Sequence, residues 1–253
     1  MQNRKAQLTL FIIVGILLVA VILFILFLYK TPDIVNNPSK NPEGFIDKCV
    51  SDSIKKEEQT ILNSNGYPDS AFKNYLLYNQ KKIPYLCVVS EFYSPCIPQE
   101  PGLMNYIQNQ IEIKVARSTE NCFTTLVSSL EKTGYSVEKK NTVLNLSIKQ
   151  GRITAEIKKD LVFKKEDTSK SIEIFSVSVP SPLFDLIKLE QTIVNYESTF
   201  CEFDYNNWML SISDILIKRD RTSDQSKVYT LTDRISEKQI KFAVKTCVLP
   251  AGI

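Results

Sequence analysis

The chain has 253 residues, with 31 Lys and Arg against 28 Asp and Glu, a net charge of +3 and no His. The basic excess lies in residues 1–30, which hold Arg4, Lys5 and Lys30 and no acidic residue, so the rest of the chain is close to neutral and gives no electrostatic support for binding nucleic acid. The absence of His removes the commonest general base, the Ser-His and Cys-His nucleophilic pairs, and the imidazole ligands of zinc sites.

An apolar run covers residues 8–29, and Thr9 is the only polar side chain between Leu8 and Phe27. As a helix this run would reach about 33 Å, enough to cross a hydrocarbon core of about 30 Å. A secretory signal usually has a shorter apolar core, followed by a cleavage site of small residues. We therefore expect a single transmembrane helix over 8–29, in contact with membrane lipid.

The flanks of this run predict its orientation. Arg4 and Lys5 favour a cytoplasmic leader over residues 1–7, because basic residues resist translocation. The bulk of the chain would then lie outside the cytoplasm. Residues 30–43 contain several Pro and Asn and predict a linker between the membrane and a domain over 44–253.

The same amino-terminal residues carry a resemblance. The stretch Arg4-Lys5-Ala6-Gln7-Leu8-Thr9 resembles the processing site of archaeal type IV pilin-like proteins, membrane-anchored surface proteins in which a basic leader is cut before a Gln that opens the hydrophobic helix. The resemblance implies processing between Ala6 and Gln7 and a role in self-assembly. Phe11 departs from the pattern, because many pilins carry a Glu there that sets subunit register.

Residues 44–134 predict a mainly helical part. Asn41 as a cap and Pro42 in the first turn begin a helix that Gly66 ends. A short helix is expected over 71–78, with irregular structure elsewhere in 67–101. A long helix is expected over 103–133, because its apolar residues recur at helical spacing.

Residues 135–253 predict a β-rich part. The alternation of apolar and polar residues over 143–148 and 153–157, separated by Gln150-Gly151, predicts a hairpin. Ser181-Pro182 predicts the start of another helix. Further strands are expected at 161–163, 172–179, 214–219, 227–231 and 240–248. The fold class is therefore α+β, with a mostly antiparallel sheet.

All six cysteines follow the apolar run, and an even number outside the cytoplasm is typical of disulfides. Three pairs are plausible, with buried free thiols as the alternative. Cys87 and Cys96 would close a short loop, Cys49 and Cys122 would join two helices, and Cys201 and Cys247 would tie the last helix to the last strand.

Few groups remain for catalysis. The seven Gly are scattered, which leaves no phosphate-binding loop and no nucleophile elbow. The carboxylates that could do acid-base work are Glu57 with Glu58, Asp204, and Asp220 with Asp224. We expect solvated charges instead, and therefore no enzyme activity, no catalytic residue, no metal site and no cofactor.

The expected function is a structural or interaction role at the cell surface. Its pilin-like form would involve protein partners or further copies of the chain. The alternative is a module that binds a glycan, peptide or solute through Tyr75, Tyr78 and Tyr93, since Tyr offers a stiff ring with a polar tip. The same aromatic residues could instead seal a core. A carboxylate-based hydrolase of the cell envelope is a third hypothesis.

Overall fold

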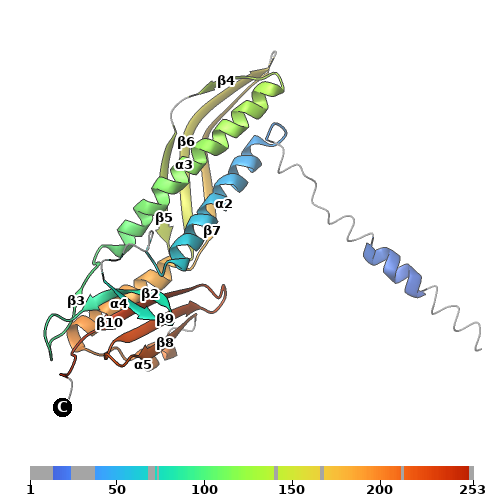
Figure 1. The fold of residues 1–253 in the computed structure, drawn as a ribbon. Helices are drawn as coiled ribbons and strands as arrows, with labels where there is room; N and C mark the ends of the chain where they lie inside the picture. Colours follow the sequence, from blue (N-terminus) through green and yellow to red (C-terminus); the bar gives the residue numbers. More distant parts are fainter. Residues whose placement is uncertain are drawn as a thin grey trace, which may run out of the picture.

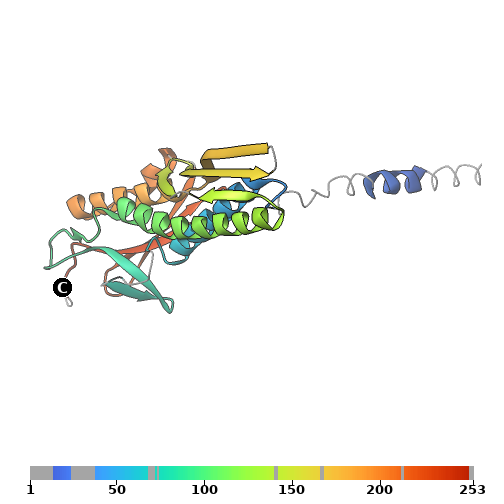
Figure 2. The same ribbon diagram turned by 90° about the horizontal axis from the view of Figure 1, so that it is seen from above.

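The computed structural model describes residues 14–23, 38–67, 72, 74–139, 142–165, 168–211 and 214–250. Two sheets and three long helices form the domain that follows residue 38 (Figure 1). Helices α2 and α3 lie side by side against one face of a four-stranded sheet, as Figures 1 and 2 show from two directions. Helix α4 packs against a six-stranded sheet at the other end of the domain. The α+β prediction is confirmed.

Local signals in the sequence set the first two helices. Helix α2 (Pro42–Asn63) begins where the Asn41 side chain accepts a hydrogen bond from the Gly44 N–H at 3.0 Å. Gly66 lies in the turn that follows the last residue of this helix, with a φ of +85° that glycine adopts without strain, and its N–H donates to the Ile61 carbonyl at 2.9 Å. Helix α3 (Leu103–Lys132) matches the long helix predicted at that place.

The four-stranded sheet is antiparallel and alternates buried and exposed side chains. Along β5, Leu144, Leu146 and Ile148 are buried against the helices, and the residues between them face solvent. Helix α3 covers the free edge of β5, because Glu112 and Gln108 accept hydrogen bonds from the N–H groups of Leu146 and Ile148, at 3.2 Å each. The strands are β4 (Ser136–Lys139), β5 (Val143–Lys149), β6 (Arg152–Lys165) and β7 (Thr168–Pro180).

The six-stranded sheet runs in the order β1-β2-β10-β9-β8, with β3 beside β2. Only the β2 and β10 pair is parallel. The β1–β2 hairpin folds over the outer face, where Ile83 packs on Val228 and Ala243, and the Tyr78 hydroxyl reaches Asp220 on the far strand at 3.1 Å. The elements are β1 (Tyr75–Tyr78), β2 (Lys81–Val88), β3 (Ile97–Pro98), α4 (Leu183–Phe200), α5 (Tyr205–Ser211), β8 (Ile215–Arg221), β9 (Lys227–Asp233) and β10 (Gln239–Lys245).

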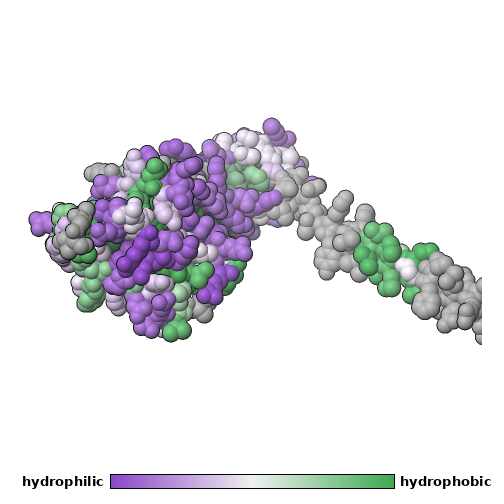
Figure 3. Space-filling view, turned by 60° about the horizontal axis from the view of Figure 1, so that its bottom comes forward, coloured by the Kyte–Doolittle hydropathy of each residue, from purple (hydrophilic) through white to green (hydrophobic). Residues whose placement is uncertain are grey.

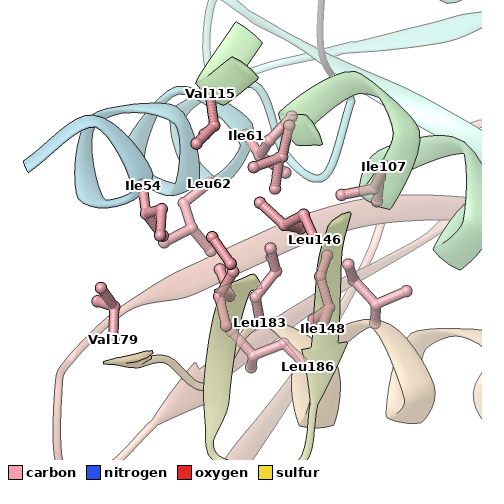
Figure 4. Close-up of a cluster of buried hydrophobic side chains, with 14 of the residues drawn as sticks. Ile54, Ile61, Leu62, Ile107, Val115, Leu146, Ile148, Val179, Leu183 and Leu186 are labelled. Carbon is pink, nitrogen blue, oxygen red and sulfur yellow. The ribbon is translucent and has the colours of Figure 1, made fainter. Parts of the chain in front are cut away.

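One hydrophobic core joins the two sheets. Figure 4 shows side chains from α2, α3, β5, β7 and α4 converging, with Ile61, Ile107, Leu146 and Leu186 among them. All four are at most 3% exposed. Both ends of the domain therefore share a continuous core.

The segment before α3 differs from the prediction. The short helix expected over 71–78 is wrong, because Tyr75–Tyr78 form β1, and the stretch expected to be irregular also contains β2 and β3. Asn79 and Gln80 both have positive φ, 49° and 64°, as a two-residue hairpin turn requires. Strand β1 is stabilised over the local helical pattern by pairing with β2, which in turn pairs with the distant β10.

Strand β6 is continuous where two strands were expected. The register between β6 and β7 shifts between Lys158 and Leu161, and Lys159 beside this shift is 6% exposed, on the buried side of β6 together with Ile157 and Leu161. There its ammonium group donates to Glu120 Oε2 at 3.2 Å and lies 4.7 Å from the centre of the Phe123 ring. The pairing of β6 with β7 continues on both sides of this irregularity.

The expectation of disulfides is confirmed, and the six cysteines form three bridges. Cys49–Cys122 joins α2 to α3, Cys87–Cys96 closes the loop after β2, and Cys201–Cys247 ties the end of α4 to the chain after β10. These are the three pairs that the sequence made plausible. Each bridge connects elements that also pack against one another.

Residues 14–23 form a helix composed only of Val, Ile, Leu, Ala and Gly. Among the described residues, no helix is both long enough and apolar enough to cross a membrane. The remainder of the apolar run, together with Ala6, Gln7 and residues 30–37 of the expected linker, lies outside the described residues. The span over 8–29 stays a prediction.

Candidate functional site

The three tyrosines proposed for binding do not form one patch. Tyr75 and Tyr78 are three residues apart in β1, so they point to opposite faces of the strand. Tyr78 is opposite Lys81 at the start of β2, and Tyr93 follows the end of β2. At about 3.3 Å per residue, these two ends of β2 are separated by roughly 20 Å. Only Tyr78 lines a cavity described below.

We call this cavity the polar hollow. It has a volume of about 490 Å³ and lies between the last turn of α2, the β1–β2 turn and the β9–β10 turn. Leu62 and Ile83 form its apolar floor, and both are at most 5% exposed. The polar side chains of its wall are Gln59, Asn63, Asn65, Tyr78, Asn79, Lys81, Ser236, Glu237, Lys238, Gln239 and Lys241.

One hydrogen bond and the packing of its ring hold Tyr78 in place in this wall. Its hydroxyl donates to Asp220 Oδ2 at 3.1 Å, and the Lys218 ammonium lies 3.3 Å from the same oxygen. Its ring packs on the buried cluster of Ile83, Val228 and Ala243. The hairpin that carries Tyr78 is therefore fixed to the sheet beneath it.

The buried carboxylate of Glu58 ties α2 to the β9–β10 turn, which forms one side of the polar hollow. Glu58 is 1% exposed and accepts hydrogen bonds from Lys238 Nζ at 2.7 Å and from the Ser181 hydroxyl at 2.6 Å. Ser181 in turn accepts the Leu183 N–H at the start of α4, at 3.1 Å. This chain of contacts joins α2, α4 and the β9–β10 turn, so the walls of the hollow are held relative to one another.

A second cavity, the apolar hollow, adjoins the β9–β10 turn on its other side and has a volume of about 670 Å³. Leu189 of α4, Trp208 of α5, Ile215 of β8 and Ile235 of the turn contribute its apolar surface. Ile235 is 85% exposed. Hydrophilic side chains cover most of the face that Figure 3 shows, with smaller apolar areas between them.

The carboxylates considered for catalysis are each engaged in structural contacts. Glu58 has the partners given above, and Glu57 lies 3.7 Å from Lys114. Asp204 accepts the Asn207 N–H at 3.2 Å at the start of α5, and Asp220 holds Tyr78. The described residues contain no group of three or more Cys, Asp or Glu placed to hold a metal ion.

Asp224 is the most strongly held of these carboxylates. Burial acts to raise its pKa, but hydrogen bonds from Thr222, Ser226 and Lys245 outweigh it and hold the pKa well below its ordinary value. Asp224 also contributes to the raised pKa of Tyr85, for which burial is the largest cause. Asp224 is therefore a charged acceptor that closes the β8–β9 turn.

No family model matches the chain, and neither a curated protein nor a solved structure matches it. The candidate site is therefore described by its own geometry.

The sequence analysis identified one residue of the polar hollow, Tyr78. It missed Lys81, Lys241 and the amide side chains, which come from three segments far apart in the sequence. Asn79-Gln80 between two apolar-rich stretches was a signal for a hairpin turn that could have located Lys81. Nothing local indicates that α2 ends beside this turn.

Proposed function

We propose that this chain is a single-pass membrane-anchored protein whose α+β domain lies outside the cytoplasm and takes part in binding at the cell surface. The observation that carries the proposal is the helix over 14–23. Eight of its side chains are large and apolar, and each is 47–64% exposed. A helix that is apolar on all sides belongs in lipid or in a core, since exposed apolar area costs about 25 cal/mol per Å² in water.

The disulfides support the extracytoplasmic location. Disulfides persist in oxidising compartments and are rare in the cytosol. The Cys49–Cys122 bridge joins residues 73 positions apart in the sequence, and the Cys201–Cys247 bridge joins residues 46 positions apart, so each closes a long loop. Reduction of such bridges would remove cross-links between the main elements of the domain.

The polar hollow supports a role in binding. Its volume is within the range of small-molecule sites, about 300–1,000 Å³, and it combines an apolar floor with polar side chains. The Ser236 hydroxyl in the wall of the polar hollow donates to Asp233. The Ser181 hydroxyl donates to Glu58, the carboxylate that also binds Lys238 of the wall. These hydroxyls serve the structure of the site, so the geometry favours binding over nucleophilic chemistry.

Fractionation tests the anchoring. The full chain should stay in the membrane fraction after alkaline extraction, and protease added to intact cells should degrade the domain. Replacing Leu18 by Lys should release part of the protein, because Lys at a helix centre costs about 2.5–3.5 kcal/mol on insertion. Leu18→Val is the matched control and should stay membrane-bound. Wild-type protein in the soluble fraction, or a protected domain, would overturn the proposal.

A pilin-like form of this role is a second candidate, and the Lys5-Ala6-Gln7 junction favours it. Mass spectrometry of the protein from its host should then find a mature chain that begins at Gln7. Replacing Ala6 by a bulky Trp should preserve the uncut leader, with Thr9→Val as a control that leaves cleavage intact. A mature chain that still contains Arg4 and Lys5 would exclude the pilin-like form and leave the static anchor.

A further inference from the structure

Two ammonium groups in the polar hollow are without a carboxylate partner in the part of the chain that the structure describes. These are Lys81 at the start of β2 and Lys241 in β10. The third lysine of the wall, Lys238, is committed to the buried Glu58 at 2.7 Å. Glu237 is the single acidic residue of the lining. The hollow therefore has a positive balance on a domain whose overall charge is close to zero, and it attracts anions.

The register of the sheet places one further lysine on the same face as Lys241. Lys241 of β10 is opposite Thr230 of β9, and Thr230 is opposite Lys218 of β8. Residues directly opposite across neighbouring strands share one face of a sheet. Lys218 is already neutralised by Asp220 at 3.3 Å, so Lys81 and Lys241 carry the free charge.

Amide side chains make up much of the remaining wall. Gln59, Asn63, Asn65, Asn79 and Gln239 each offer a carbonyl acceptor and an NH₂ donor. Two of these side chains bond to each other, since Gln59 Nε2 donates to Asn63 Oδ1 at 2.9 Å. Both amides keep further donors and acceptors for other hydrogen bonds. An amide side chain can donate and accept hydrogen bonds at the same time. It therefore suits a ligand hydroxyl group, which can also do both.

The apolar surface of the hollow is small and fixed. Ile83 and Leu62 form the floor, and the Tyr78 ring is held by its hydroxyl on Asp220. Such a floor suits the C–H face of a sugar ring, while the amides at the wall suit the hydroxyls at its edge. The lining of the hollow contains no Arg, so the anionic group of a ligand would meet the point charges of Lys81 and Lys241 and no planar fork. The amide side chains around these two lysines call for a ligand that carries hydroxyl groups beside its anionic group.

We propose that the polar hollow binds an acidic saccharide, in which carboxylate groups face Lys81 and Lys241 and hydroxyl groups face the amide side chains. The inference deepens the proposed binding role at the cell surface by naming the site and the ligand class. The ligand is either a free oligosaccharide or a segment of a surface polysaccharide, because both present the same uronate units.

The test is calorimetric titration of the purified full chain in detergent micelles. Tetragalacturonate should bind, and neutral maltotetraose should bind at least tenfold more weakly. The Lys81→Gln/Lys241→Gln double variant should weaken tetragalacturonate binding at least tenfold. The control is Lys149→Gln/Lys158→Gln, which removes the same charge from exposed positions on the other sheet and should leave binding unchanged. Equal melting temperatures of the two variants exclude unfolding as the cause.

Three results would overturn the saccharide site. These are no binding of galacturonate in either tetrameric or polymeric form, equal binding of the acidic and the neutral tetrasaccharide, or equal weakening by the two double variants. Polymeric galacturonate that binds where the tetramer does not would place the ligand on a surface polysaccharide, and binding of the tetramer shows that a free oligosaccharide suffices. The titration does not depend on topology, so it can fail while the membrane anchoring stands, and the fractionation can fail while the titration succeeds.

Discussion

Replacing Lys227 by Met should lower the free energy of unfolding by about 3–5 kcal/mol, because it would leave the buried Glu197 without its cation. Lys227 Nζ lies 2.7 Å from Glu197 Oε2, and Glu197 is fully buried. The Tyr229 hydroxyl donates to the other Glu197 oxygen. Chemical denaturation monitored by circular dichroism measures the change.

The network around this pair explains the expected size of the effect. Lys227 also donates to the Cys201 carbonyl at 2.6 Å and lies 2.9 Å from Glu202 Oε2. Burial acts to raise the pKa of Glu202, but hydrogen bonds from Lys227 and Arg219 hold it below its ordinary value. Thr246 donates to the Glu197 carbonyl at 3.2 Å, beside the Cys201–Cys247 bridge. One lysine therefore links the end of α4 to the six-stranded sheet.

Two further variants separate the pair from general packing. Lys227→Met with Glu197→Gln should recover at least half of the loss, because Gln carries no charge and still accepts the Tyr229 hydroxyl. Lys218→Met removes an exposed lysine from the neighbouring strand and should change stability by no more than about 0.5 kcal/mol. A loss below about 1 kcal/mol in Lys227→Met would show that the buried pair contributes little.

Elements with strong local signals could be predicted from the sequence. Asn41 caps the start of α2 and Gly66 lies in the turn after its end, and the 3.6-residue spacing of apolar residues located α3 and α4. Two-residue alternation on both sides of Gln150-Gly151 located the hairpin of β5 and β6. In each case the signal lies within the element itself.

Features that depend on distant pairing could not be predicted. Strand β2 is stabilised by β10, more than 150 residues later, and the polar hollow needs α2, β1–β2 and β9–β10 together. The carboxylates in the core were also missed, although Glu190 and Glu197 fall on the apolar stripe of α4 with Ile193 and Val194. An acidic residue on such a stripe was a usable signal that it is buried.

Glu190 is the second of these core carboxylates. It is fully buried, and neither of its side-chain oxygens has a hydrogen-bond partner among the residues that the structure describes. A Cβ at Gly66 would lie 3.6 Å from one of them, which places the carboxyl against the end of α2. Burial disfavours the charged form and raises the pKa of Glu190 well above its ordinary value.

This raised pKa predicts that stability falls as pH rises. Below about pH 4.5 the carboxyl is protonated in both states and has no effect. Above that value the unfolded chain releases the proton and the folded chain keeps it, so the unfolded state is favoured. The free energy of unfolding should then decrease by about 1.4 kcal/mol per pH unit, until the pH passes the raised pKa of the folded state.

Glu190→Gln should remove this dependence, since the amide does not titrate. The variant should gain stability over the wild type as pH rises from 4.5 to 8, and denaturant melts at half-unit intervals would show the two curves diverging. Glu131→Gln is the matched control on an exposed face of α3, where the carboxyl meets solvent in both states, and its curve should stay parallel to that of the wild type. If the stability curve of Glu190→Gln is also parallel to that of the wild type, the Glu190 carboxyl ionises in the folded protein. An interior partner such as ordered water would then have to stabilise its charge.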